Sequence, residues 1–490
     1  MDTQRIICDD SIPNLHPTLR RVHTLRIDEG TKSSKAVILI EKLKLRDKTE
    51  SVIVEFHSIE DTVRILKALG SKLKKCVLYL SGSLKSLESI ELNVECLKLW
   101  IGDNDCTEMF KFFKNIKNLH LMGFSPKNES VLEILVKNNL RTLEKLKIDY
   151  VFESESDEKT HDYLKEIKYL RVFQTSGKNK AFKSVLGEFP LLETLGVLNC
   201  ELKCEDVQKI KILKNLKNFS GSHLTSQNIN DILEIESLER VEFSESDILE
   251  INFEKSINLK ELSLCNVKVS NQALETCFKS TPILRDLSFI SLVGITSEVF
   301  VIISKHLKYL KNFYIEGIDF LGDFPEIKMS QLNSFSLTNS KLLNKFLKSF
   351  WAEHLINIDL CNSSEITDEG IGFLVGNCPN LKYVDISGCT GLTNLSVNIL
   401  SSNLTNVLTL IARNCNGFSL DVIGIVLKLS TNLEYADFSY ILEREDDDLF
   451  EDELETMAKT KSPLLKVCKS CLIIYLILNL ISHYSRQRRT

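Results

Sequence analysis

The chain has 490 residues, of which 43% are hydrophobic and 26% are charged, as is ordinary for a folded protein. Its formal net charge of -6 argues against nucleic acid as a partner, because such binding needs a basic surface. Residues 1–10 hold no apolar run of signal-peptide length, so the 14 cysteines indicate reduced thiols rather than a disulfide framework. The cytosol or the nucleus is the expected compartment.

A strand motif of the form L-x-x-L-x-L recurs from residue 22 onward. Its first copy is Val22-x-x-Leu25-x-Ile27, and a weak copy follows near Val54 and Phe56. Further copies begin at Leu73, Val94, Ile116, Leu143, Leu170, Leu192, Leu216, Leu238, Leu259, Leu284, Leu310 and Leu332. Together with four copies nearer the C-terminus, they predict about 18 strands at spacings of roughly 21 to 29 residues.

The last four copies are the most regular. They begin at Leu355, Leu381, Val407 and Leu433, each 26 residues after the one before. Thr367, Thr393 and Ser419 keep the same step, and so do Cys389 and Cys415. A fixed period of about 20 to 30 residues that carries this motif is typical of leucine-rich repeats.

Each repeat predicts a strand followed by a helix. The alternation over Leu381–Ser387 predicts a strand with its apolar side chains inward, and the Thr or Ser that follows can cap a helix. The apolar stripe of one such helix comprises Ile371, Phe373, Leu374 and Cys378. Because one repeat cannot bury its own apolar face, neighbouring repeats must stack. The predicted fold is an α/β leucine-rich repeat solenoid, a horseshoe with a parallel inner sheet and outer helices.

The predicted solenoid spans residues 22–440, with an N-terminal cap over residues 1–21. Residues 441–490 are expected to hold an acidic insert and a C-terminal capping helix. The insert is the run Glu443–Glu455, which favours a solvated loop over an acidic docking segment, as does Glu153–Lys159.

The most apolar run of the chain is Cys471–Ile481. It has 11 residues, fewer than the about 20 that a membrane-spanning helix needs. The run therefore favours a helix that covers the last repeat, and a tail anchor is the alternative.

Residues 355–415 carry a more specific pattern around the strand motif. Leu355–Cys361 matches the first part of the pattern L-x-x-L-x-L-x-x-C and Asp385–Cys389 matches its end. Ile366–Ile371 is close to I-T-D-x-G-L, and Asn377–Leu381 contains the C-x-x-L start of the next unit. This stretch resembles the cysteine-containing leucine-rich repeats of F-box/LRR (RNI-like) proteins. The resemblance implies a horseshoe fold and the role of substrate-recruiting subunit in a Skp–cullin ubiquitin ligase.

An F-box, the helical segment that such proteins carry upstream of the repeats, is not recognisable. Only 21 residues precede Val22, and Ser11–Leu15 does not continue into the F-box pattern. Binding of the Skp adaptor is therefore expected only if the full gene product contains an F-box.

The sequence contains no credible catalytic constellation. It lacks a Gly-rich phosphate loop, H-E-x-x-H and a nucleophile elbow. Cys468 and Cys471 form a C-x-x-C pair without a second pair, so no zinc site is predicted. Cys200, Cys389 and Cys415 occupy the same place in their repeats, which predicts buried thiols that donate to carbonyls. We expect no enzyme activity, no metal and no cofactor.

The function is expected on the concave face of the sheet, at the x positions of the motif. The first third offers Lys98, Trp100, His120, Lys145 and Lys147, and the last third offers Asp359, Tyr383, Asp385, Tyr435 and Asp437. The middle offers Ser220, Ser263, Ser288, Ser334 and Ser336. Exposed Trp and Tyr are typical interface anchors, and the split from basic to acidic favours a partner of opposite polarity.

The sequence thus predicts a protein-interaction module, most plausibly a substrate-recognition subunit of an SCF-type ubiquitin ligase in ubiquitin-dependent protein catabolism. The alternatives are a scaffold or inhibitor without a ligase link, and a tail-anchored membrane adaptor. The expected partner is a protein substrate or adaptor on the concave face, and no nucleic acid.

Overall fold

A computed structural model of the chain describes residues 4–6, 24–27, 32–42, 45, 49–70, 72–81, 92–100, 110–111, 113–125, 128–150, 162–177, 181–248, 258–320, 323–341, 344–419, 421–422, 425–426, 433–439, 465–468 and 473–476. The chain divides into unit 1, Met1–Leu238, and unit 2, Glu239–Thr490. Both predicted acidic segments, Glu153–Lys159 and Glu443–Glu455, lie outside the described residues.

Unit 1 is built on a parallel sheet whose strands pair in chain order. These strands are β1 (Gln4–Ile6), β2 (Thr24–Ile27), β3 (Ser51–Ser58), β4 (Lys75–Ser81), β6 (Cys96–Trp100), β8 (Asn118–Phe124), β9 (Lys145–Tyr150), β10 (Val172–Ser176), β11 (Thr194–Leu198) and β12 (Asn218–Ser222). Two short strands, β5 (Leu92–Asn93) and β7 (Phe113–Lys114), pair separately.

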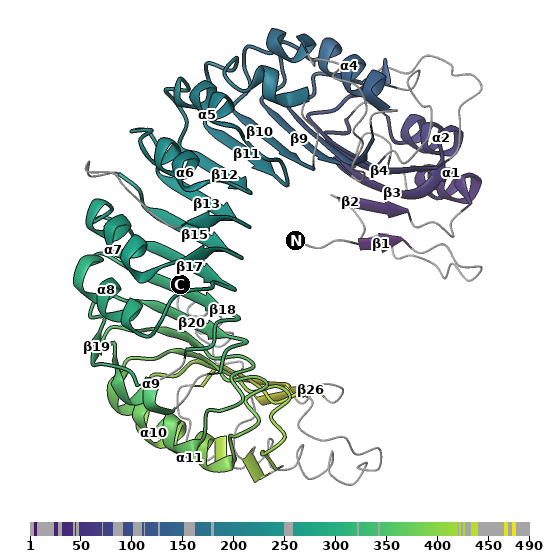
Figure 1. Cartoon of the computed structure of the whole chain (residues 1–490). Helices are drawn as coiled ribbons and strands as arrows, with labels where there is room; N and C mark the ends of the chain where they lie inside the picture. The colour runs from purple at the N-terminus through teal and green to yellow at the C-terminus, as the bar shows by residue number, and fades with distance from the viewer. Residues whose placement is uncertain are drawn as a thin grey trace, which may run out of the picture. The chain divides into compact units, whose positions relative to one another are not determined.

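The helices of unit 1 lie along one face of this sheet (Figure 1). They are α1 (Ser33–Lys42), α2 (Ile59–Leu69), α4 (Glu129–Asn138), α5 (Cys204–Lys211), α6 (Ser226–Leu233) and the 3-10 helices η2 (Asp162–Glu166) and η3 (Ala181–Val185). No helix of the described residues lies on the opposite face of the sheet (Figure 1).

Unit 2 repeats the arrangement. Its parallel strands are β13 (Arg240–Ser244), β15 (Glu261–Cys265), β17 (Asp286–Ile290), β18 (Asn312–Glu316), β20 (Ser334–Thr338), β22 (Asn357–Asp359), β23 (Tyr383–Asp385), β24 (Thr409–Ile411) and β25 (Tyr435–Asp437). Short parallel pairs join β14 (Asp247–Ile248) to β16 (Lys268–Val269) and β19 (Ile327–Lys328) to β21 (Phe350–Trp351).

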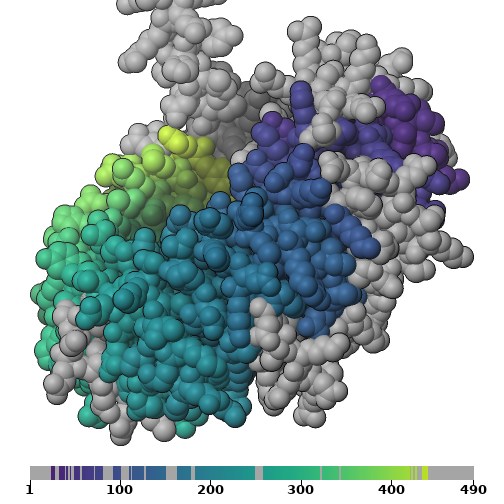
Figure 2. All heavy atoms as spheres, turned by 90° about the horizontal axis from the view of Figure 1, so that it is seen from above, coloured from purple at the N-terminus to yellow at the C-terminus, as the bar shows by residue number. Residues whose placement is uncertain are grey.

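Helices again cover one face of the sheet (Figure 1). They are α7 (Asn271–Ser280), α8 (Glu298–His306), α9 (Asn344–Ser349), α10 (Asp368–Asn377) and α11 (Asn394–Asn403). Within each unit the colour changes gradually over the surface in Figure 2, because each repeat packs against its neighbours in sequence.

The predicted fold class, an α/β leucine-rich repeat solenoid, is confirmed. Each predicted strand coincides with a parallel strand among the described residues, nine in unit 1 and nine in unit 2. Ile358, Leu360, Val384 and Ile386 are fully buried, as the alternation predicts. The core between repeats of unit 2 is rich in phenylalanine, with the Phe313 ring centroid 5.5 Å from that of Phe289 and 5.8 Å from that of Phe335.

Two details of the repeat prediction are wrong. In β3 the motif positions are Val52 and Val54, which pair with Leu25 and Ile27 of β2, rather than Val54 and Phe56. In α10, Phe373 is only half-buried, under the Lys348 ammonium, although Ile371 and Leu374 are buried as predicted.

The C-terminal segment also differs from the prediction. Ile473–Leu476, where a helix is expected, forms strand β27, which pairs antiparallel with β25 and with β26 (Leu465–Cys468). An antiparallel strand therefore ends the parallel series of unit 2. Among the described residues, no helix combines the length and the apolar character needed to cross a bilayer. The predicted boundaries at residues 21 and 440 stay a prediction.

Candidate partner-binding face

The open face of each unit consists of the strand side chains that point away from the helices. Motif residues point into the core, and the residues before, between and after them point to the open face. The parallel register sets these side chains opposite one another, so they form rows across the strands.

The open-face residues predicted in the first third come from three adjacent strands of unit 1. The register aligns Lys98 of β6 with His120 of β8 and His120 with Lys147 of β9. Trp100 lies two residues after Lys98, and Lys145 lies two residues before Lys147. All five side chains are exposed or half-buried, so the sheet brings these predicted residues together.

Asp149 offsets part of this positive charge. Its carboxylate lies 2.6 Å from Nε2 of His120 and 3.6 Å from Nζ of Lys147, and it accepts a hydrogen bond from the Ser176 hydroxyl. Burial, with the charges of Lys147 and Lys98, lowers the pKa of His120 below its usual value, although the hydrogen bond to Asp149 and its charge act in the opposite direction. Although burial favours the protonated acid, the hydrogen bond from His120 and the charge of Lys147 lower the pKa of Asp149. His120 is therefore neutral at pH 7 and donates its Nε2 proton to a charged carboxylate.

Trp100 lies against the backbone of the neighbouring strand. A Cβ on Gly123 would come within 2.5 Å of Nε1 of Trp100, and the φ of Gly123 is +64°. Glycine thus provides both the left-handed conformation and the space for the indole.

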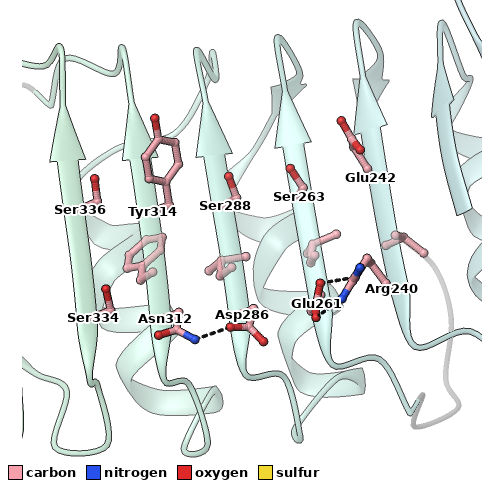
Figure 3. A pocket seen from close by; sticks show the side chains of 14 residues that line it. Arg240, Glu242, Glu261, Ser263, Asp286, Ser288, Asn312, Tyr314, Ser334 and Ser336 are labelled. Atoms are coloured by element: carbon pink, nitrogen blue, oxygen red, sulfur yellow. Dashed lines mark hydrogen bonds and ion pairs between the residues drawn. The ribbon is translucent and has the colours of Figure 1, made fainter. Parts of the chain in front are cut away.

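Unit 2 has a hollow of about 280 Å³ on its open face (Figure 3). One row across β13 to β20 contains Glu242, Ser263, Ser288, Tyr314 and Ser336. Because serine is short, the surface is low at Ser263 and Ser288, between the longer Glu242 and Tyr314 side chains, and again at Ser336 on the far side of Tyr314 (Figure 3). The predicted serines Ser263, Ser288, Ser334 and Ser336 thus line a depression.

The side chains of the neighbouring row, at the rim of this hollow, already bind one another. Nη2 of Arg240 donates to Glu261 at 2.5 Å, and Nδ2 of Asn312 donates to Asp286 at 2.5 Å. The Tyr314 hydroxyl donates to Glu316, and burial together with this carboxylate raises the pKa of Tyr314. Sequence reasoning missed Arg240, Glu242 and Tyr314, although each occupies an x position of the same motif.

The aspartates predicted in the last third share a structural role. Oδ1 of Asp359, Asp385 and Asp437 accepts the backbone N–H two residues later, at 3.0 Å in each case. This side-chain turn ends the strand in three repeats. Asp359 and Asp385 are half-buried, and their second oxygens accept from the hydroxyls of Ser336 and Tyr383. Asp437 is completely buried and accepts from Nε of Arg413.

Tyr383 and Tyr435 are half-buried on the open face, two residues before an aspartate. The Tyr435 hydroxyl donates to Asp437 at 3.1 Å, and that of Tyr383 lies 3.4 Å from Asp385. These contacts orient both rings. Burial and the charges of Asp385 and Asp359 raise the pKa of Tyr383 to about 12.

The cysteines of the last repeats behave as predicted. The thiols of Cys389 and Cys415 are buried and donate to the carbonyls of Leu360 and Ile386, at 3.1 and 3.2 Å. Burial raises the pKa of Cys389 to about 12 and that of Cys415 to about 11. These thiols are therefore protonated and unreactive at pH 7.

Asp359, Cys361 and Asp385 bring one ligand atom each within 4.8 Å of one another. Burial and hydrogen bonds to both carboxylates raise the pKa of Cys361. The thiol is thus held as a donor to the carboxylates, and a metal would need it as a thiolate.

No family model and no curated protein sequence matches the chain. A solved structure titled as the Rad7 and Elc1 complex in yeast is similar, with 15% sequence identity over 80% of this chain and 86% of the other, and a TM-score of 0.38. An internalin (inlF) from Listeria monocytogenes is similar at 15% identity over 79% of this chain and 85% of the other, with a TM-score of 0.32. The parallel strands and covering helices of this chain by themselves show the fold of a leucine-rich repeat solenoid.

Proposed function

We propose that this chain is a non-enzymatic protein-interaction module that binds a protein partner on the open face of its sheet. The observation that carries the proposal is the hollow on unit 2, where short serines lie between Glu242 and Tyr314. Repeat solenoids commonly use such an extended sheet face for binding. A concave site with a few polar groups and one aromatic ring has the chemistry of an interface anchor pocket.

The more specific proposal is that the chain recruits substrates to an SCF-type ubiquitin ligase in the cytosol or nucleus. Its support is the resemblance of residues 355–415 to the repeats of F-box/LRR proteins. The buried Cys389 and Cys415 thiols are consistent with that resemblance, because they occupy equivalent places in their repeats.

Co-purification of the full gene product with the Skp adaptor tests the ligase link. We expect a stoichiometric complex that survives size-exclusion chromatography. Ser288→Trp, which fills the hollow, should leave this complex intact, because the adaptor is expected to bind upstream of the repeats. A full gene product that does not retain the adaptor would exclude the ligase role and favour a scaffold or inhibitor.

A further inference from the structure

The hollow on unit 2 is large enough to hold a side chain of a partner and is bordered by carboxylates. By the same measure of volume a single water needs only about 15 Å³, whereas the hollow offers about 280 Å³. We infer that it seats an extended, basic segment of a protein partner, with an arginine side chain in the hollow. This inference rests on the proposed function, since it takes the partner to be a protein.

The floor of the hollow is closed and its walls differ in chemistry. Leu262, Leu287 and Phe313 lie beneath it and are at most 3% exposed, so an occupant rests on the serine row rather than entering the core. Tyr314 presents an aromatic ring between Ser288 and Ser336, and Glu242 presents a carboxylate at the β13 end (Figure 3).

The charges around the hollow favour a cationic occupant. The guanidinium of Arg240, a cation beside the hollow, forms an ion pair with Glu261. Glu242, Asp286, Glu316, Asp359 and Asp385 make no ion pair with any Lys, Arg or His among the described residues. Glu242, Asp286 and Glu316 lie on β13, β17 and β18, at or beside the hollow, and Asp359 and Asp385 lie further along the sheet on β22 and β23. A partner that covers these carboxylates must bring its own positive charge.

Arginine fits this combination better than lysine. Its planar guanidinium stacks on an aromatic ring and pairs with carboxylates through several N–H donors, while its aliphatic stem covers the short serines. An ammonium group lacks the planar face.

The length of the hollow favours an extended segment. Its lining comes from five neighbouring strands, β13 to β20, which span about 19 Å at about 4.8 Å per strand. That distance accommodates roughly six residues of extended chain at about 3.3 Å each.

A short fluorescein-labelled peptide in which arginines alternate with serines tests the inference by anisotropy on the full chain. We expect saturable binding that weakens with added salt. Tyr314→Ala should weaken binding roughly threefold or more, whereas Tyr314→Phe, which keeps the ring, should bind like the wild type. Replacing the arginines of the peptide by lysines should also weaken binding.

Two further variants separate the hollow from charge alone. Glu242→Gln should weaken binding of the peptide. Glu369→Gln removes an exposed charge from α10 on the helical face and should leave peptide binding unchanged. Ser288→Trp keeps every carboxylate but fills the hollow, so it should abolish specific binding. Circular dichroism confirms that each variant is folded.

Equal losses in Glu242→Gln and Glu369→Gln, or unchanged binding in Ser288→Trp, would overturn the inference in favour of nonspecific charge attraction. A chain that retains the Skp adaptor but binds no peptide would overturn the inference and leave the ligase role standing. A chain that binds the peptide but does not retain the adaptor would support the inference and exclude the ligase role.

Discussion

Single residues with a left-handed backbone follow the strands of successive repeats. They include Asn199, His223, Glu245, Asn266, Ser291, Asn339, Asn362 and Asn414, with φ between 47° and 57°, and Gly317 and Gly388, with φ of 64° and 69°. Asparagine and glycine tolerate this conformation best, because the asparagine amide can bond locally and glycine has no Cβ. Serine and glutamate at the same place retain conformational strain.

Ser291→Gly should therefore stabilise the chain by about 1 kcal/mol or less, once the greater freedom of glycine in the unfolded chain is subtracted. Ser288→Gly, in the regular part of the same strand, should instead cost about 0.5 to 1 kcal/mol. Urea unfolding of both variants measures the difference. A stabilised Ser288→Gly would contradict the conformational explanation.

The His120–Asp149 contact predicts how stability changes with pH. The folded pKa of His120 lies below 6.5, so on acidification below that value the unfolded chain binds a proton that the folded chain excludes. Stability should therefore fall as pH drops from about 7 toward the folded pKa of His120, and fall again below about 3.8 as Asp149 is protonated. Lys98 and Lys147 add to the first effect by repelling the imidazolium.

His120→Gln keeps an amide donor for Asp149 but does not titrate. It should lose less stability than the wild type between about pH 7 and pH 5.5 in urea unfolding. Identical pH dependence in the two proteins would show that His120 does not contribute to the acid sensitivity.

At the scale of elements, repeats are joined by hydrogen bonds between successive helix starts. Nδ2 of Asn344 donates to Oγ1 of Thr367 at 2.7 Å, and its Oδ1 accepts the Thr367 backbone N–H at 3.1 Å. One repeat later the Asp368 carboxylate accepts both the backbone N–H and the hydroxyl of Thr393. The predicted cap is thus only partly correct, since Thr393 caps its own helix, whereas Thr367 has no side-chain cap bond and is held by the preceding repeat.

Asn344→Ala should destabilise unit 2 by about 1 to 2 kcal/mol, because it removes both bonds to Thr367. Asn344→Asp should retain most of the stability, since Asp368 makes the same contacts with a carboxylate. Thermal melts of the two variants provide the comparison. Equal losses would show that the contact contributes little.

The stack itself depends on the buried strand positions. Ile358→Asp places an unpaired charge at a fully buried site and should cost more than about 4 kcal/mol, unfolding the C-terminal repeats. Asn357→Asp, at the adjacent exposed position, should have little effect. Far-UV circular dichroism distinguishes the two, and a folded Ile358→Asp would refute the inward assignment.

For the whole molecule, the repeated strands were predictable because alternation and a fixed period act together. The β3 register was missed because Val52, Val54 and Phe56 offer two alignments, and Thr49 stands at the first motif position where leucine is expected. β27 was missed because a continuous apolar run does not distinguish strand from helix. The alternation of the motif places Asp437 on the open face, but its side chain is buried. Its carboxylate accepts from the backbone N–H and the hydroxyl of Ser439, and the sequence shows this spacing of an aspartate and a serine two residues apart.

Partner binding on the open face of unit 1 can be tested at Trp100. Its side chain is half-buried against Gly123, so Trp100→Ala should lower stability by about 1 kcal/mol or less while it weakens a protein bound on that face. A thermal melt and a binding titration with the captured partner measure both effects. If Trp100→Ala unfolds the protein, the indole belongs to the core rather than to the open face.

The reversed direction of β27 decides which strand forms the edge of the sheet in unit 2. A parallel sheet that stopped at β25 would present unpaired N–H and C=O groups in the same orientation that every earlier strand uses to receive its neighbour. β27 covers that edge of β25, and β26 pairs with the other side of β27. Two successive antiparallel pairings restore the original direction, so the outermost described strand, β26, runs the same way as the strands of the repeats.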